Sequence, residues 1–305
     1  FVSRKFQKSS NTSHTMETIS NQELSVSISA LGAEIQSVRD VRTGQEYWWN
    51  GDARFWSGRA PLLFPVVGRL WDDTARFGRT TTQIPKHGVV RKVEWILVEQ
   101  SETQVTYRRI GTVADFTVFP FSWTLEVTYV LSARRLEARF RVINTGSGEL
   151  LFQFGGHPAL ALPDCAEDRE CAGFVQLEGD LTHFRLVGEQ GCVRDEKLPL
   201  GEMSEGLVPL TVSRFAQEAL IFDEGQVKAA TLLRVDKSPV ARVESTAPVW
   251  LFWRPVGENA PFVCPEPWYG LCDYEHYAGD FSSRPFVQKA APGSDWTGGF
   301  SVEFF

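Results

Sequence analysis

The sequence LEARFRV at residues 136–142 alternates apolar and polar side chains, which is the pattern of a β-strand with one buried face. The same alternation occurs in LEVTY at residues 125–129 and in LSVSI at residues 24–28. Similar segments recur along the chain at a spacing of ~8–12 residues, with Gly and Pro in the turns between them. Only residues 273–281 suggest a short helix. These patterns predict an all-β fold, a large antiparallel β-sandwich or barrel.

Composition excludes several classes of protein. The 305 residues include 38 acidic and 31 basic side chains, a formal net charge of −7, which argues against a nucleic-acid-binding surface. There is no apolar run of about 18 residues, so no membrane span is expected. The five cysteines contain no CxxC pair, which argues against a disulfide framework and a zinc site. The 22 Phe and 10 Trp favour strands, and most of them should lie in the core.

The chain shows no change of composition that would mark a linker, and no internal repeat. We therefore predict a single domain over residues 16–305. Residues 1–15 precede Met16 and are polar and basic, without the apolar segment of a signal peptide. We expect them to be an unfolded leader or a segment added for expression. A cytoplasmic location is the corresponding prediction.

His157 lies in the sequence FQFGGHPAL at residues 152–160. The glycine pair permits a positive φ or a close approach to another group, and we expect it to open the strand end. The following proline restricts the backbone of His157 toward the extended region. A histidine held in this way is suited to proton transfer. The alternative is a core histidine beside a structural turn.

Glu266 lies in VCPEPWYG at residues 263–270, between two prolines that fix φ and remove two backbone donors. If this carboxyl is buried beside Trp268, desolvation will raise its pKa. The alternative is an exposed glutamate in a turn.

Two further polar residues stand among apolar neighbours. Arg69 could bind substrate or form a salt bridge to Asp72 or Asp73. His87 could bind substrate or cap a strand from a loop. The remaining histidines (His14, His183 and His276) and two nearby acids (Asp273 and Glu275) have polar neighbours in the sequence and are expected at the surface.

The chain contains none of the phosphate-loop, dinucleotide-binding, zincin or nucleophile-elbow motifs, so we expect no metal and no cofactor. One positioned histidine and one positioned carboxylate suit general acid–base catalysis on a polar organic substrate. Each such group contributes about 10²–10⁴-fold, enough only for a reaction that is already fairly easy in water. The opening and closing of a sugar hemiacetal is such a reaction.

Four motifs occur in the order and spacing found in aldose 1-epimerases: PVVGR (65–69), KHG (86–88), GGHP (155–158) and CPEPW (264–268). The chain resembles this family, and most of all its shorter bacterial, galactose mutarotase-like branch. The resemblance covers essentially residues 16–305. It implies an antiparallel β-supersandwich with an open sugar-binding cleft.

The resemblance also implies roles for single residues. Glu266 would be the base that takes the proton from the anomeric O1 hydroxyl, and His157 the acid that protonates the ring oxygen O5. Rotation about C1–C2 and reclosure would then give the other anomer. His87 and Arg69 would hold sugar hydroxyls, and Trp268 could lie against the ring.

Two departures from the family leave the sugar open. LWDD (70–73) stands where galactose mutarotases carry an Asn and a second Arg, and Glu218 stands where the short branch commonly has an Asp. The expected partner is a monosaccharide, an aldohexose that could be phosphorylated, bound by a monomer or a homodimer.

Three alternatives to this activity stay open. One is a hexose-6-phosphate 1-epimerase, in which Arg59, Arg69 or Arg91 would bind phosphate. Another is a non-catalytic sugar-binding protein that kept the cleft. The third is a glycosidase with paired carboxylates, for which Glu266 is the one obvious candidate.

Overall fold

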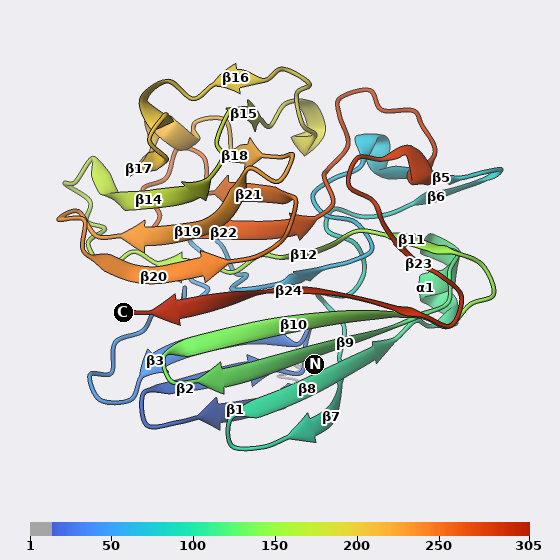
Figure 1. Ribbon diagram of the computed structural model, residues 1–305, viewed down its shortest axis with the longest axis horizontal. Helices are drawn as coiled ribbons and strands as arrows, with labels where there is room; N and C mark the ends of the chain where they lie inside the picture. The colour runs from blue at the N-terminus through green and yellow to red at the C-terminus, as the bar shows by residue number, and fades with distance from the viewer. Residues whose placement is uncertain (1–13) are drawn as a thin grey trace, which may run out of the picture.

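The computed structural model describes residues 14–305. Nearly all of the predicted leader, residues 1–13, lies outside this range, and the first strand, β1, begins at Met16. Every pairing between named strands is antiparallel, which confirms the all-β antiparallel fold (Figure 1). Within residues 14–305, no helix has the length and apolar character needed to cross a membrane.

The larger of the two main sheets has nine strands and extends across the molecule in Figure 1, from β7 at its lower edge to β17. Its strands in spatial order are β17 (Leu207–Thr211), β14 (Cys171–Gly179), β19 (Val227–Leu233), β20 (Pro239–Glu244), β24 (Asp295–Phe304), β10 (Arg135–Asn144), β9 (Trp123–Ser132), β8 (Gln104–Ile110) and β7 (Ile96–Gln100).

The alternation seen in the sequence sets the register at the centre of this sheet. Strands β9 and β10 pair over ten residues, with Phe140 opposite Val127. Both residues are buried, while the charged neighbours Arg139 and Arg141 are exposed on the other face. Because the side-chain period of a strand is two, one face of the pair is apolar throughout.

The second main sheet has eight strands and carries the candidate site. Its strands in spatial order are β16 (Leu198–Pro199), β15 (His183–Leu186), β18 (Ala219–Phe222), β21 (Val249–Trp253), β22 (Phe262–Tyr269), β12 (Phe154–Gly156) and β4 (Leu62–Leu63), and β13 (Leu160–Ala161) also pairs with β22.

Smaller elements complete the fold. Three further sheets are smaller. One has three strands, β1 (Met16–Ser20), β2 (Leu24–Ser29) and β3 (Glu34–Asp40). The other two have two strands each: β5 (Thr74–Phe77) with β6 (Thr80–Gln83), and β11 (Leu150–Phe152) with β23 (Gln288–Ala290). The helical segments are α1 (Val113–Val118) and the 3₁₀ turns η1 (Trp71–Asp73), η2 (Glu189–Gly191), η3 (Gly201–Met203), η4 (Ser213–Phe215) and η5 (Phe281–Ser283).

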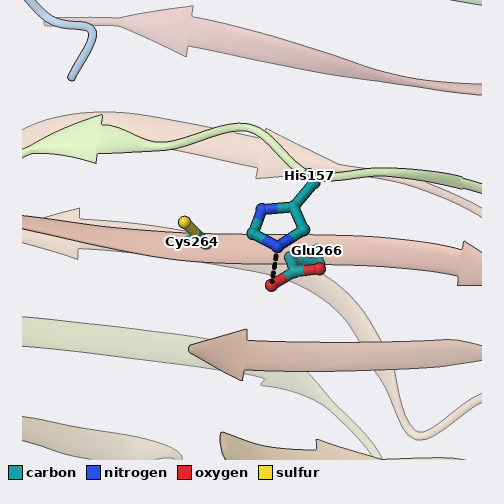
Figure 2. A group of neighbouring side chains, drawn as sticks. All are labelled: His157, Cys264 and Glu266. Atoms are coloured by element: carbon teal, nitrogen blue, oxygen red, sulfur yellow. Dashed lines mark ion pairs between the residues drawn. The ribbon is translucent and has the colours of Figure 1, made fainter. Parts of the chain in front are cut away.

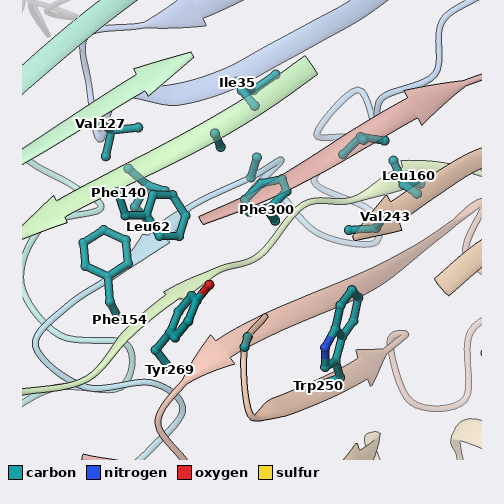
Figure 3. Packing of buried hydrophobic residues seen from close by; sticks show 14 of the residues in the cluster. Ile35, Leu62, Val127, Phe140, Phe154, Leu160, Val243, Trp250, Tyr269 and Phe300 are labelled. Carbon is teal, nitrogen blue, oxygen red and sulfur yellow. The ribbon is translucent and has the colours of Figure 1, made fainter. Parts of the chain in front are cut away.

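The main core is a cluster of buried hydrophobic side chains from both large sheets and from β1–β3 (Figure 3). Aromatic rings from the two main sheets pack against one another in this core. Phe140 of β10 packs on Phe154 of β12 with ring centroids 4.4 Å apart, and Phe140 also contacts Phe300 of β24. The prediction that most aromatic residues belong to the core agrees with this packing.

Two sequence predictions were wrong around Asp273. The segment 273–281 is not a helix; in the described chain only the 3₁₀ turn η5 forms at its end. Asp273 is not a solvated charge, because it is buried and accepts a hydrogen bond from Arg284 Nε at 2.7 Å. It also accepts the N–H of Trp71 at 3.0 Å. The buried carboxylate is therefore paired with groups from two other segments of the chain.

His183 was also wrongly placed at the surface. It is buried at the start of β15, where its Nε2 lies 2.8 Å from Asp223 Oδ1. Arg185 donates to the other oxygen of Asp223 at 2.9 Å. The local sequence is polar because these groups satisfy one another inside the fold. His14 and His276 are exposed, as predicted.

Candidate active site

Glu266 lies in the middle of β22 and is fully buried. Alternate residues of β22 divide between two faces: Val263 and Tyr269 belong to the main core, whereas Trp268 packs in a separate cluster. Glu266 shares the face of Trp268 because side chains two positions apart in a strand point the same way. The carboxyl group thus points away from the main core.

The two prolines beside Glu266 coincide with a gap in the sheet. β21 pairs with β22 from residue 264 to residue 268. On the other side of β22, β13 pairs with residues 262–263 and β12 with residues 268–269, so residues 264–267 have no ladder partner there. Proline has no N–H to donate, so it suits such a gap. The chain around His157 passes this gap between β12 and β13.

The glycine pair before His157 allows the backbone to pack closely against neighbouring rings. Gly155 and Gly156 are both buried in β12, and neither has a positive φ. A Cβ on Gly155 would lie 2.7 Å from Cδ1 of Trp268, and one on Gly156 would lie 2.6 Å from the Phe300 ring. Of the two expected roles, the structure shows the close approach.

His157 and Glu266 form a buried pair, with His157 Nε2 3.2 Å from Glu266 Oε1 (Figure 2). Burial lowers the pKa of His157 to about 3. Burial likewise raises the pKa of Glu266 well above its usual range, a rise that Lys86 opposes. Both directions favour the uncharged forms. The two side chains together therefore carry one titratable proton over a wide range of pH.

His87 is a neutral hydrogen-bond donor beside this pair. The backbone N–H of Gly68 donates to His87 Nδ1 at 3.0 Å, so the ring proton must lie on Nε2. Burial lowers the pKa of His87 well below its usual value, and His157 lowers it further. The His87 and His157 rings lie edge to face, with centroids 5.5 Å apart.

Glu218 and Lys86 form an ion pair of 3.2 Å, and each is partly exposed. Glu218 has a φ of 69° and His87 has a φ of 66°. Such left-handed conformations are costly for residues with a Cβ and are concentrated at functional sites. Two of them beside one ion pair make this region a candidate functional site.

A pocket of about 150 Å³ joins these groups. Five of the predicted site residues line it: His87, His157, Glu218, Glu266 and Trp268. Arg69 is not among its lining residues; its guanidinium is partly exposed and pairs with Asp73 at 3.0 Å, the alternative considered for it.

A larger hollow of about 920 Å³ lies over β9, β10 and β24. Its charged side chains are largely neutralised by one another, as in the pairs Arg139–Glu137 and Arg135–Glu244, both at 2.7 Å. It contains no buried acid–base pair. We therefore take the smaller pocket as the candidate active site.

The sequence of residues 15–281 matches the family model for aldose 1-epimerase. The chain belongs to the aldose 1-epimerase family. It is 28% identical to the chromosomal protein LacX of Lactococcus lactis subsp. lactis, over 90% of this chain and 94% of that one.

Solved structures agree with this membership. A galactose mutarotase-like protein from Lactobacillus casei superposes with a TM-score of 0.90 at 26% identity, over 95% of this chain and 100% of that one. A galactose mutarotase related enzyme from Lactobacillus acidophilus superposes with a TM-score of 0.86 at 26% identity, over 95% of this chain and 97% of that one. The aldose 1-epimerase family and these neighbours support a mutarotase-type isomerase that acts on a sugar.

Two tryptophans of this epimerase-family pocket were not predicted from the sequence. Trp56 and Trp253 both line it and both lie against His157. Their sequence signal is only that of aromatic residues in a turn and a strand, which most often indicates core. Lys86 and Arg91 also line the pocket, and Lys86 could have been noticed as the neighbour of His87.

Cys264 adds a sulfur atom to the group in Figure 2, where ligand atoms of His157, Cys264 and Glu266 lie within 4.8 Å of one another. Such donors suit a soft divalent metal. Burial raises the pKa of the Cys264 thiol well above its usual value, so without a metal the thiol is protonated. His157 and Glu266 of this cluster are also the two candidates for acid–base chemistry.

Proposed function

We propose that this protein is an aldose 1-epimerase that interconverts the α and β anomers of an aldohexose. The observation that supports this proposal is the buried His157–Glu266 pair at 3.2 Å beside a pocket with polar groups. Glu266 is the base for the O1 hydroxyl, and His157 is the acid for O5. No nucleophile or cofactor is needed for this reaction.

The protons balance within the pair. In the reactive form, His157 is an imidazolium and Glu266 a carboxylate. Ring opening moves the O1 proton to Glu266 and the imidazolium proton to O5, which leaves both side chains neutral and the sugar as an open aldehyde. The resting pair carries the same single proton on Glu266, so its transfer to His157 precedes ring opening, and burial then favours the neutral side chains that ring opening leaves. Reclosure on the other face of C1 reverses both transfers.

The remaining lining residues supply contacts for sugar hydroxyls. His87 donates through Nε2–H, Glu218 accepts, and Lys86 donates from its ammonium group. Trp268 offers an apolar face for the ring. Arg69 would have to leave Asp73 to reach the sugar, so we place it outside these contacts.

Polarimetry of freshly dissolved α-glucose and α-galactose tests the proposal. We expect the wild type to accelerate mutarotation, and His157→Asn and Glu266→Gln each to lower the rate by about 10²–10⁴-fold. Circular dichroism should show both variants folded. A wild type that binds these sugars without changing the rate would indicate a non-catalytic sugar-binding protein. Full activity in either variant would refute the assigned roles.

A hexose-6-phosphate 1-epimerase is a second candidate, because Lys86 and Arg91 place two cations on the pocket wall. Arg59, proposed for phosphate on sequence, instead donates to the backbone oxygen of Gln36 at 2.6 Å. Comparing glucose with glucose 6-phosphate in the same assay separates the two candidates. A preference for the phosphate that Lys86→Met abolishes would favour the second.

We also infer a cytoplasmic location. All five cysteines are free, as is usual in a reducing compartment.

A further inference from the structure

The His157 ring is held by packing more than by hydrogen bonds. Its Nδ1 is buried and has no hydrogen-bond partner within residues 14–305. Histidines that transfer protons are usually oriented by a hydrogen bond on the second ring nitrogen. No other residue in the described range 14–305 supplies that bond, so contacts with the neighbouring side chains help to fix the direction of Nε2 toward Glu266.

Three rings surround His157, and they differ in geometry. Trp56 stacks on it face to face, with centroids 4.8 Å apart and planes 28° apart. Trp253 and His87 contact it edge-on, at 5.8 Å with 70° and at 5.5 Å with 85°. Trp56 is thus the one tryptophan whose π face covers the imidazole plane.

The loop before β4 is built to hold Trp56 in this position. The Trp49 indole N–H donates to the Trp56 carbonyl at 2.8 Å. The Trp56 ring also packs against Phe262, with centroids 5.9 Å apart and planes 26° apart. Gly58 leaves the space the indole needs, because a Cβ there would overlap its six-membered ring.

We propose that Trp56 is a positioning residue that acts through His157: its indole face fixes the plane of the imidazole and stabilises its cationic form. This inference rests on the proposed function and adds to it a residue outside the four family-like motifs. The π face of an indole attracts a cation, by an amount that grows when the site is desolvated. The imidazolium that donates to O5 is such a cation.

The test compares Trp56→Phe, which keeps an aromatic face, with Trp56→Leu, which does not. We expect the Phe variant to keep kcat within about threefold of the wild type. We expect the Leu variant to lose about 2- to 30-fold in kcat, with KM within about threefold. Phe55→Leu is the matched control: Phe55 contacts Trp49 on the same loop but lies outside the pocket, so kcat should not change.

Gly58→Ala provides a second variant if Trp56→Leu does not fold. It keeps the tryptophan but displaces the indole, and we expect a similar loss in kcat. Equal activity of the Phe and Leu variants would overturn the proposal. So would a rise in KM at unchanged kcat, which would make Trp56 a platform for the sugar.

Histidine ¹⁵N spectra separate this inference from the proposed function, because they require no turnover. His157 signals are identified by their loss in His157→Asn. We expect them to match the wild type in Trp56→Phe and to shift or broaden in Trp56→Leu. Unchanged His157 signals in Trp56→Leu would overturn the role of Trp56 even in an active enzyme. An inactive wild type with the expected shift would refute only the proposed sugar.

Discussion

At the scale of single residues, Glu266 lies in an energetically unfavourable environment. Its carboxyl group is fully buried, and neither oxygen has a regular hydrogen bond from the side chains and backbone of residues 14–305. Leaving a buried polar group in this state costs about 1–3 kcal/mol. We attribute its presence to the proposed proton transfer, in which Glu266 gains and loses a proton during each reaction.

This burial gives a prediction for stability against pH. Because the folded pKa of Glu266 is raised, its carboxyl stays protonated while the unfolded chain ionises. At a pH below the usual pKa range of glutamate, both states are protonated and Glu266 does not change the stability of the fold. As the pH rises from that range toward the folded pKa, the free energy of unfolding falls. Glu266→Gln lacks this loss, so we expect it to exceed the wild type by on the order of 1 kcal/mol at pH 7–8 and to match it near pH 4.

Urea denaturation at several pH values measures this difference. Glu205→Gln serves as the control, because Glu205 is exposed and its substitution should change the free energy of unfolding by less than about 0.5 kcal/mol at any pH. A wild type as stable as Glu266→Gln at pH 8 would contradict the raised pKa.

At the scale of elements, β12 brings His157, the proposed catalytic acid, to β22 through its small residues. Gly155 packs against Trp268 and Val67, and Gly156 packs against Phe300. The two glycines let β12 lie close to Trp268 of β22 and to Phe300 of β24, while Phe154 of the same strand packs in the core. The position of His157 opposite Glu266 depends on this contact.

Gly155→Ala tests the contact. Its Cβ would lie 2.7 Å from Trp268 and 3.0 Å from Val67, so we expect a loss of about 1–3 kcal/mol in the free energy of unfolding. Because Trp268 lines the pocket, the KM for the sugar should rise as well. Gly148→Ala is the control, since nothing lies within 4 Å of a Cβ there. Equal stability of the two variants would argue against packing as the role of the glycine.

At the scale of the whole molecule, buried charges tie distant segments together. Arg284 donates to Asp273 through Nε at 2.7 Å and to the backbone oxygen of Thr74 at 3.2 Å. Asp273 in turn accepts the N–H of Trp71. The long loop after β22 is thereby joined to the segment at η1 and β5.

We expect Arg284→Met to lower the free energy of unfolding by about 3–5 kcal/mol, because it leaves Asp273 buried without its partner. Arg139→Met is the control: Arg139 and Glu137 form an exposed pair, and such pairs contribute about 0–1 kcal/mol. Chemical denaturation measures both. A loss below about 1 kcal/mol in Arg284→Met would show that the loop does not depend on this salt bridge.

Parts of this structure could be predicted from residues close together in the chain. Alternating segments such as LEARFRV predicted the antiparallel sheets, because the period of a strand is a local property. The short motifs predicted His87, His157 and Glu266 as neighbours of a sugar. Trp56 carried no such signal, because an aromatic residue in a turn has no local feature that distinguishes a site from a core.

The sequence by itself thus determined the fold class and most of the candidate polar groups, through periodicity and through prolines and glycines beside them. Only the tertiary structure decided which of these groups meet. It placed His157 3.2 Å from Glu266, turned Arg69 toward Asp73, and buried Asp273 beside Arg284 and His183 beside Asp223. The physical reason is that burial and contact across sheets depend on strand order and register, which no short stretch of residues contains.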